Sequence, residues 1–194
     1  VLIVADKSSN PEWLASDLLG QAEHDQLAQC ILISKDKNIL EKTKKEVFEQ
    51  LKNLPRSSIA KKSLMMNGIL IYANSDKKII EITNKIGPEH LELNVKNYKS
   101  FVAKIKNAGS VCLGKYAVMA MTDYGAPGSN HVLPTDSSSK YSSGLNVSEF
   151  MKKISYITLS KKGIDKLGPS VITLANYEGL QGHAQSIVKR IRRK

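Results

Sequence analysis

Short apolar runs alternate with longer amphipathic stretches through the first part of the chain. The runs have the length and composition of buried strands, and they lie at 1–5, 28–34, 68–73, 90–93 and 110–113. The stretches between them have helical periodicity, and we expect helices over 10–25, 38–54, 59–66, 77–86 and 98–108. Strands that alternate with helices in this way predict a parallel α/β sheet with right-handed crossovers.

Two of the expected helix boundaries carry specific signals. Asn10-Pro11-Glu12 combines an N-cap residue, a proline at the first helical position and an acid in the first turn. Gly87-Pro88 is a stop signal for the helix before it. These signals predict where the first helix begins and where the fourth helix ends.

The pattern changes after Leu113. Residues 123–146 lack an apolar period and are rich in Gly, Pro and Ser, so we expect a loop. Beyond it we expect mostly helix, over 147–154, 161–166, 168–176 and 179–192, with a short extended piece at 156–159. We interpret this last part as a C-terminal helical arm that packs on a partner chain.

Composition narrows the class of protein. The net charge of +11 would suit nucleic-acid binding, but the lysines are spread over helical stretches, and only 189–194 is densely basic. Aromatic residues make up 6% and show no stacking arrangement, so solvated helix faces explain the charge better. With no run near the roughly 18 apolar residues of a membrane span, and with Cys30 and Cys112 inside apolar runs, we expect a cytoplasmic protein without membrane or nucleic-acid partners.

The stretch from Asp123 to Thr135 is the most distinctive one. It carries a carboxylate, an amide and an imidazole among two glycines and two prolines. Gly and Pro at this density direct the backbone and let it approach a ligand closely, and binding residues are common on such loops. The alternative is a surface turn with incidental polar residues.

The other three histidines also have polar companions. Gln21 lies three residues before His24, Glu89 precedes His90 directly, and Glu178 lies five residues before His183. Imidazole, amide and carboxylate groups together can bind zinc, and an adjacent acid and imidazole can act as a pair if both reach one substrate. Taken singly, each histidine is better explained as a surface residue or as one with satisfied hydrogen bonds, and neither a metal-spacing signature nor a phosphate-binding glycine loop accompanies them.

The chain thus has four polar stations, each a histidine with its polar companion. Taken in order, they resemble the histidinol dehydrogenase family of zinc- and NAD-dependent enzymes, which complete histidine biosynthesis. The matching motifs run through nearly the whole chain: Asp17-Leu-Leu-Gly-Gln-Ala-Glu-His-Asp25, Gly87-Pro-Glu-His-Leu-Glu92, Asn107-Ala-Gly109, Asp123-Tyr124, Asn130-His-Val-Leu-Pro-Thr135 and Glu178-Gly-Leu-Gln-Gly-His183.

The resemblance implies a role for each polar station. The catalytic pair would be Glu89 and His90, with His90 as the base and Glu89 activating the water that attacks the aldehyde. The implied zinc ligands are Gln21, His24, Asp123 and His183. The implied substrate-binding residues are Gln21, His24, Glu89, His90, Asp123, His131, Glu178 and His183.

The implied reaction converts L-histidinol through L-histidinal to L-histidine, with two hydrides passed to NAD⁺. The resemblance further implies a homodimer that exchanges its arms, so that Glu178 and His183 complete the partner's site. The expected organisation is a Rossmann-like α/β domain over 1–125, a substrate and metal loop over 126–146 and a helical dimerisation arm over 147–194.

Two departures from the family pattern stand out. The chain resembles only the C-terminal half of the family's enzymes, opens at Val1 without a methionine, and lacks the half with most NAD contacts. The NAD-contacting residues therefore stay unassigned, and a separate N-terminal half would have to supply them. The loop also has one extra residue, Pro127. The alternative to an enzyme is a truncated homologue without turnover, which binds a metal or ligand.

Overall fold

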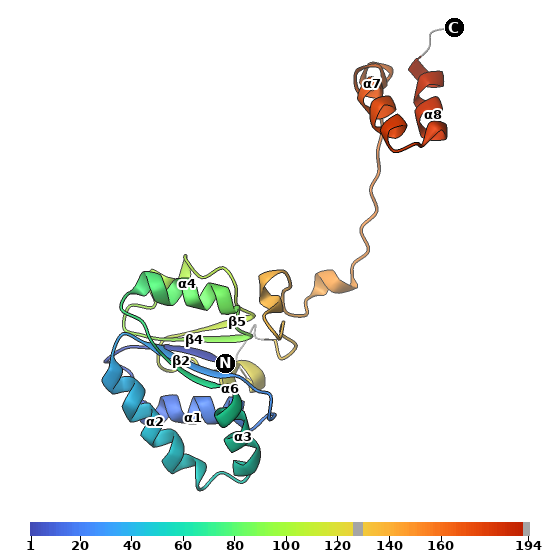
Figure 1. The fold of residues 1–194 in the computed structure, drawn as a ribbon. Helices are drawn as coiled ribbons and strands as arrows, with labels where there is room; N and C mark the ends of the chain where they lie inside the picture. The colour runs from blue at the N-terminus through green and yellow to red at the C-terminus, as the bar shows by residue number, and fades with distance from the viewer. Residues whose placement is uncertain (126–129, 192–194) are drawn as a thin grey trace. The chain divides into compact units, whose positions relative to one another are not determined.

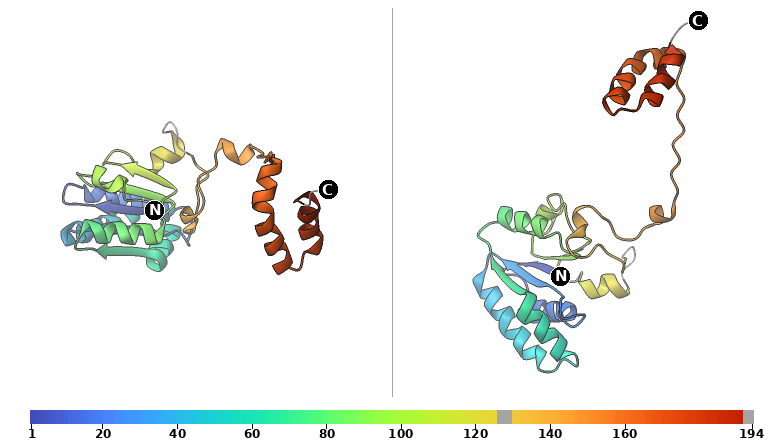
Figure 2. Two further views of the ribbon diagram at one scale, coloured as in Figure 1. Left: turned by 90° about the horizontal axis from the view of Figure 1, so that it is seen from above. Right: turned by 45° about the vertical axis from the view of Figure 1, so that its right-hand side comes forward.

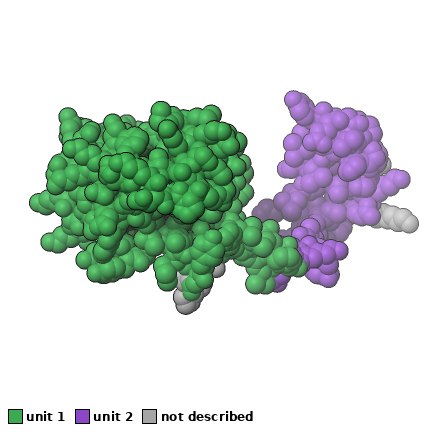
Figure 3. Space-filling model, turned by 90° about the horizontal axis from the view of Figure 1, so that it is seen from below, with its two compact units in different colours: residues 1–150 green, residues 151–194 purple. Residues whose placement is uncertain are grey.

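The computed structural model describes residues 1–125 and 130–191. The chain forms two compact units, Val1–Phe150 and Met151–Lys194 (Figure 3).

The first unit is built on a five-stranded parallel sheet with the order β3-β2-β1-β4-β5. Its strands are β1 Leu2–Ala5, β2 Cys30–Ser34, β3 Gly68–Tyr72, β4 His90–Asn94 and β5 Ser110–Leu113. Leu2 pairs with Ile31 on one side and with Leu91 on the other, so β1 is central. The predicted Rossmann-like parallel sheet is confirmed, because this strand order is that of the doubly wound fold.

Helices cover both faces of the sheet (Figure 1). One face packs on α1 Pro11–Ala22, α2 Lys37–Leu51 and α3 Ser57–Asn67, and its core contains Ile3, Leu14 and Leu32. The other face packs on α4 Asp76–Ile86 and α5 Lys99–Val102, where Leu91 and Ile79 are buried. Successive residues of a strand point to opposite faces, and two-sided burial therefore explains the continuous apolar runs in the sequence.

The helix predicted over 98–108 is much shorter in the structure, where only Lys99–Val102 is α-helical. The Asn84 side chain of α4 accepts hydrogen bonds from the backbone N–H groups of Lys106 and Asn107, and it donates one to the Lys104 carbonyl. These backbone groups find their partner in another element, so the helical ladder ends early.

The loop predicted over 123–146 is wrong at its start, because Asp123 belongs to α6 Met119–Tyr124. The Met119 N–H at the beginning of α6 donates to Oε1 of Glu92 at 2.8 Å. This acceptor comes from β4, so the local pattern of apolar residues could not reveal it. Two 3₁₀ turns, Ser138–Lys140 and Val147–Phe150, follow. Pro127 lies outside the described residues.

The second unit contains a helical hairpin of α7 Lys161–Tyr177 and α8 Gln181–Ile191 (Figure 2). The two helices predicted over 161–176 form one helix that continues through Pro169. The helix predicted over 147–154 is wrong, since only the 3₁₀ turn forms there. Residues 151–160 are exposed and without regular structure, which is expected of a segment with no packing partner within its unit. None of the described helices is long and apolar enough to cross a membrane.

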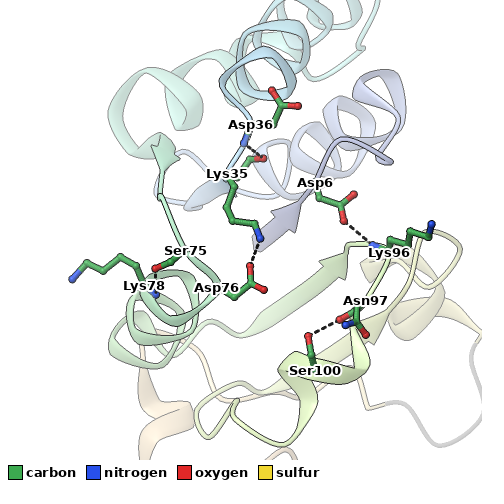
Figure 4. A network of polar contacts seen from close by, with 10 residues as sticks. Asp6, Lys35, Asp36, Ser75, Asp76, Lys78, Lys96, Asn97 and Ser100 are labelled. Carbon is green, nitrogen blue, oxygen red and sulfur yellow. Dashed lines mark hydrogen bonds and ion pairs between the residues drawn. The ribbon is translucent and has the colours of Figure 1, made fainter.

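Hydrogen bonds and an ion pair connect the loops at the carboxyl ends of the strands (Figure 4). Doubly wound folds usually bind ligands in the crevice where the strand order reverses, here beyond β1 and β4. The Asp6 carboxylate accepts from the Lys96 N–H across this crevice at 2.8 Å, and Ser9 Oγ donates to the Asn94 carbonyl at 2.6 Å. The polar residues of the first unit that the sequence singles out lie elsewhere, at the amino ends of the strands.

Candidate active site

A cavity of about 240 Å³ lies at the amino edge of the sheet, beside the first residue of β4. Its lining consists of Gln21, His24, Glu89, His90, Asp123 and His131. All six are residues for which the sequence predicts a role, and they come from three of the four polar stations of the chain. The fold therefore brings the predicted stations of the first unit together in one place.

The end of α1 supplies Gln21 and His24. The helix begins where Asn10 Oδ1 accepts the Glu12 N–H at 2.9 Å, and it runs toward the amino edge of the sheet until Ala22. His24 lies two residues beyond Ala22, and its backbone N–H donates to the Gln21 carbonyl at 3.2 Å, which keeps the two residues together. Gln21 Oε1 is buried without a hydrogen-bond partner among the described residues. A buried unpaired oxygen is costly, so this atom is suited to a ligand.

A turn between α4 and β4 supplies Glu89 and His90. Gly87 ends α4 in the left-handed conformation with φ of 61°, which glycine adopts without steric cost. The Glu89 carbonyl then accepts the Ser110 N–H at 2.8 Å, and the Pro88 carbonyl accepts the Gly109 N–H at 2.9 Å. The start of β5 thus fixes the backbone on which the acid and the imidazole stand.

The remaining polar groups come from α6 and the segment after it. His90 Nε2 lies 3.7 Å from Oδ1 of Asp123, and both side chains are only 6% exposed. His131 Nδ1 lies 3.3 Å from the Asp123 carbonyl oxygen, and its ring meets that of Tyr124 edge to face. Asp123 therefore contacts one histidine through its side chain and another through its backbone.

Burial shifts the acid–base properties of the two adjacent residues in opposite directions. Desolvation lowers the pKa of His90, although the Asp123 carboxylate opposes this effect. Desolvation raises the pKa of the half-buried Glu89 carboxyl. The lowered pKa keeps the His90 imidazole neutral at neutral pH, so that it can accept a proton, and the raised pKa makes the Glu89 carboxylate more basic.

Part of the cavity has the donor set of a metal site. Gln21 Oε1 has no partner among the described residues, and the Asp123 carboxylate is almost fully buried. An amide oxygen, a carboxylate and the His24 imidazole are ligand types that zinc accepts, so these residues fit such an ion. Within the described ranges, no group of three or more His, Cys, Asp or Glu side chains is arranged to bind a metal ion. The first unit therefore offers a partial ligand set.

Glu178 and His183 belong to the second unit. Glu178 caps the end of α7, and His183 lies in the first turn of α8, with both residues exposed. The structure defines their positions within the α7–α8 hairpin. Their roles remain predictions.

Two acids near the cavity, Glu92 buried and Asp17 half-buried, were missed by the sequence reasoning. Asp17 lies on α1 and Glu92 on β4, and Glu92 is only 1% exposed. Both residues are part of the motifs quoted above. The available signal was the position of Glu92 between two leucines of an apolar run, where a solvated charge is not expected.

Three comparisons with known proteins agree on the family. The family model for histidinol dehydrogenase matches residues 1–191. A histidinol dehydrogenase of Pelagibacter ubique is 74% identical over the whole chain, and one of Listeria monocytogenes is 44% identical over 96% of it. The crystal structure of histidinol dehydrogenase from Elizabethkingia anophelis superposes with a TM-score of 0.82 at 40% identity, covering 98% of the chain.

The chain spans less than half of each of these relatives. It covers 45% of the Pelagibacter protein, 44% of the Listeria protein and 43% of the Elizabethkingia chain. The family model nevertheless matches from the first strand to the end of α8. The chain belongs to the histidinol dehydrogenase family.

Proposed function

We propose that the chain carries the catalytic and metal-binding part of a histidinol dehydrogenase, which oxidises L-histidinol through L-histidinal to L-histidine with NAD⁺. The observation that supports this most directly is that Gln21, His24, Glu89, His90, Asp123 and His131 line one cavity. The net reaction transfers two hydrides and consumes one water, so the site needs a proton acceptor and a group that activates water.

His90 is the proposed proton acceptor. Its ring is buried, which favours the neutral form, and Nε2 faces the Asp123 carboxylate at 3.7 Å. A neutral imidazole can accept the alcohol proton as hydride leaves, and the nearby carboxylate stabilises the imidazolium that results. The same ring can accept a proton from the aldehyde hydrate in the second oxidation.

Glu89 is the proposed activator of water. Its carboxyl lines the same cavity as His90, and partial burial raises its pKa. A carboxylate with raised basicity can remove a proton from the water that attacks the aldehyde carbon. The hydrogen bonds that the neighbouring β5 backbone makes to Pro88 and Glu89 hold this group in position.

Zinc would be held by Gln21, His24, Asp123 and His183, and the substrate would also contact His131 and Glu178. When bound, zinc would polarise the alcohol oxygen, and NAD⁺ would accept the hydride. His183 and Glu178 stand on the α7–α8 hairpin. We propose that this hairpin is an arm exchanged between two subunits, so that each arm completes the site of its partner in the cytoplasm.

A second function is a binding module without turnover. The observation in its favour is that the chain covers only 45% of the Pelagibacter relative. In that case the cavity would still bind zinc or L-histidinol. Hydride transfer would be absent, because it needs the NAD-binding N-terminal half of the family's enzymes.

The deciding experiment measures NADH formation from L-histidinol, zinc and NAD⁺. The chain is assayed alone and together with the part of the Pelagibacter ubique protein that it does not cover, since the two proteins are 74% identical. We expect activity in the mixture, and loss of that activity when His90 is changed to Asn. Absence of NADH from a mixture that forms a stable complex and binds zinc would favour the binding module.

A further inference from the structure

A pair of acids, Glu92 buried and Asp17 half-buried, lies next to the candidate active site. Glu92 on β4 is 1% exposed, and the Asp17 carboxylate on α1 lies close enough to raise its pKa. Asp17 Oδ2 and Glu92 Oε2 are both buried, and neither has a hydrogen-bond partner among the described residues. Two neighbouring carboxylates that are shielded from water do not both stay ionised. One proton shared between them would give each of the two oxygens a hydrogen-bond partner.

The electrostatics of the pair agree with a retained proton. Burial and the Asp17 charge raise the pKa of Glu92 to about 8, and burial raises the pKa of Asp17 to about 6. The other titratable groups that act on the pair are Cys112 on β5 and the amino group of Val1. Burial raises the pKa of the Cys112 thiol to about 12, so it adds no charge at neutral pH.

The second oxygen of Glu92 reaches a third element. Glu92 Oε1 accepts the Met119 N–H at 2.8 Å at the start of α6, which has no side-chain cap of its own. The first N–H groups of a helix lack partners within the helix. Glu92 therefore supplies the missing acceptor for α6 while it also contacts α1.

Each of the residues Asp17, Glu92 and Met119 lies one helical turn, or two residues along a strand, from a residue that lines the cavity. Asp17 precedes Gln21 by one helical turn, and Met119 precedes Asp123 by one turn. Glu92 and His90 are two apart on β4 and so project from the same face of the sheet. One network beneath the cavity thus connects the three segments that carry Gln21, His90 and Asp123.

We propose that Asp17 and Glu92 are positioning residues, which share one proton and set the spacing of Gln21, His90 and Asp123. This inference rests on the proposed function only in taking Gln21 and Asp123 as zinc ligands and His90 as the base. It requires that the pair keep both its reach and its single proton. A change in either property should move the cavity residues without contact between the pair and any substrate.

Matched substitutions separate reach from charge. Glu92→Gln keeps the length of the side chain and replaces the shared proton with an amide N–H that donates to Asp17. Glu92→Asp keeps the carboxyl but shortens the side chain by one methylene. Thr83→Ser is the control, because it also removes one buried carbon, on α4 at the opposite face of the sheet, and keeps the hydrogen bond to the Ile79 carbonyl.

The measurement is a carbon–proton correlation spectrum of the histidine rings, recorded on the chain without zinc, NAD⁺ or substrate. The chain has four histidines, and His183 on α8 serves as an internal reference. We expect Glu92→Asp to move the His90 signal by more than a linewidth, while Glu92→Gln and Thr83→Ser leave it in place. Because the spectrum needs no turnover, failure of the proposed activity would leave the result interpretable.

Two results would overturn the proposal. One is a folded Glu92→Asp protein whose His90 signal matches the unchanged chain, which would mean that the pair does not position the site. The other is a Glu92→Gln protein that moves this signal as far as Glu92→Asp does. If Glu92→Asp fails to fold, Asp17→Asn and Asp17→Ala provide the same comparison from α1, with a shift expected only for Asp17→Ala.

Discussion

The imidazole of His90 and the carboxylate of Asp123 meet at 3.7 Å in a setting that is only 6% exposed on either side. His90 begins β4 and Asp123 stands near the end of α6, so tertiary structure alone creates this contact. Burial keeps the ring neutral before a proton arrives, and the carboxylate stabilises the charge afterwards. A buried general base needs both effects.

Substitutions at these two residues should separate the base from the metal ligand. In the mixture of the chain with the complementary Pelagibacter part, His90→Asn should lower the rate of NADH formation by about 10²–10⁴-fold, the usual contribution of a general base. Its zinc content should stay unchanged. Asp123→Asn should lower both, because the proposed ligand loses its charge. Equal zinc loss in the two proteins would show that His90 is not simply a base.

Glu89 should be required for the second oxidation only. Glu89→Gln keeps the size of the side chain but cannot take a proton from water. We therefore expect the reconstituted enzyme to form about one NADH for each L-histidinol consumed, in place of two, because the aldehyde is no longer hydrated efficiently. Product analysis should find L-histidinal. Two NADH per substrate at a normal rate would assign water activation to another group.

Much of the sheet is readable from the sequence because its strands are buried on both faces. The run at 90–93 and the Gly87-Pro88 stop signal place His90 at the start of β4, next to Glu89. Asn10 and Pro11 similarly fix the start of α1 and hence the phase of Gln21. These features depend on neighbours in the sequence, so a local pattern carries them.

The sequence could not predict features that depend on contacts between elements. Asp123 is helical because Glu92 provides the acceptor at the start of α6, and the helix after Tyr98 ends early because Asn84 takes its backbone groups. The Asp17–Glu92 pair is likewise formed between α1 and β4. The motifs contain the six residues that line the cavity, whereas the Asp17–Glu92 pair and its contact with α6 required the three-dimensional structure.

His24→Ala should weaken zinc binding by about 100-fold or more, given that even outer partners of metal ligands contribute 10–100-fold. The reason is that His24 is the only imidazole among the proposed ligands that line the cavity. Gln26→Ala is a suitable control, since Gln26 is exposed on the same segment and does not line the cavity. Competition with a chelating dye would measure the affinity, and unchanged binding in His24→Ala would disprove the ligand assignment.

Gly109 should tolerate no side chain, for a reason connected with Glu89. A Cβ atom there would lie 2.6 Å from the Glu89 carbonyl oxygen and 3.0 Å from Cδ of Pro134, so the backbone would have to move. We expect Gly109→Ala to lower the free energy of unfolding by about 1–3 kcal/mol and to reduce NADH formation further by displacing Glu89. Chemical denaturation and the reconstituted assay would measure the two effects.

Gly20→Ala is the matched control for Gly109→Ala. A Cβ at position 20 would meet only Cε of Met119, at an ordinary 3.6 Å, inside helix α1. The substitution should therefore raise the free energy of unfolding by about 0.5–1 kcal/mol through helix propensity. If Gly109→Ala were as stable as Gly20→Ala, the close approach of β5 to Glu89 would not constrain the site.

The free energy of unfolding should fall as the pH rises from about 5 to about 8. Glu92 has a folded-state pKa of about 8 against an ordinary value of 4.5, so its stabilising contribution is complete below the ordinary value and is lost as pH rises through the folded value. At 1.4 kcal/mol per pKa unit, the loss should be on the order of 2–4 kcal/mol. Glu92→Gln has no proton to lose at this position and should show a flatter profile. Urea unfolding of both proteins across this range would test the difference, and parallel profiles would show that Glu92 is already ionised in the native protein.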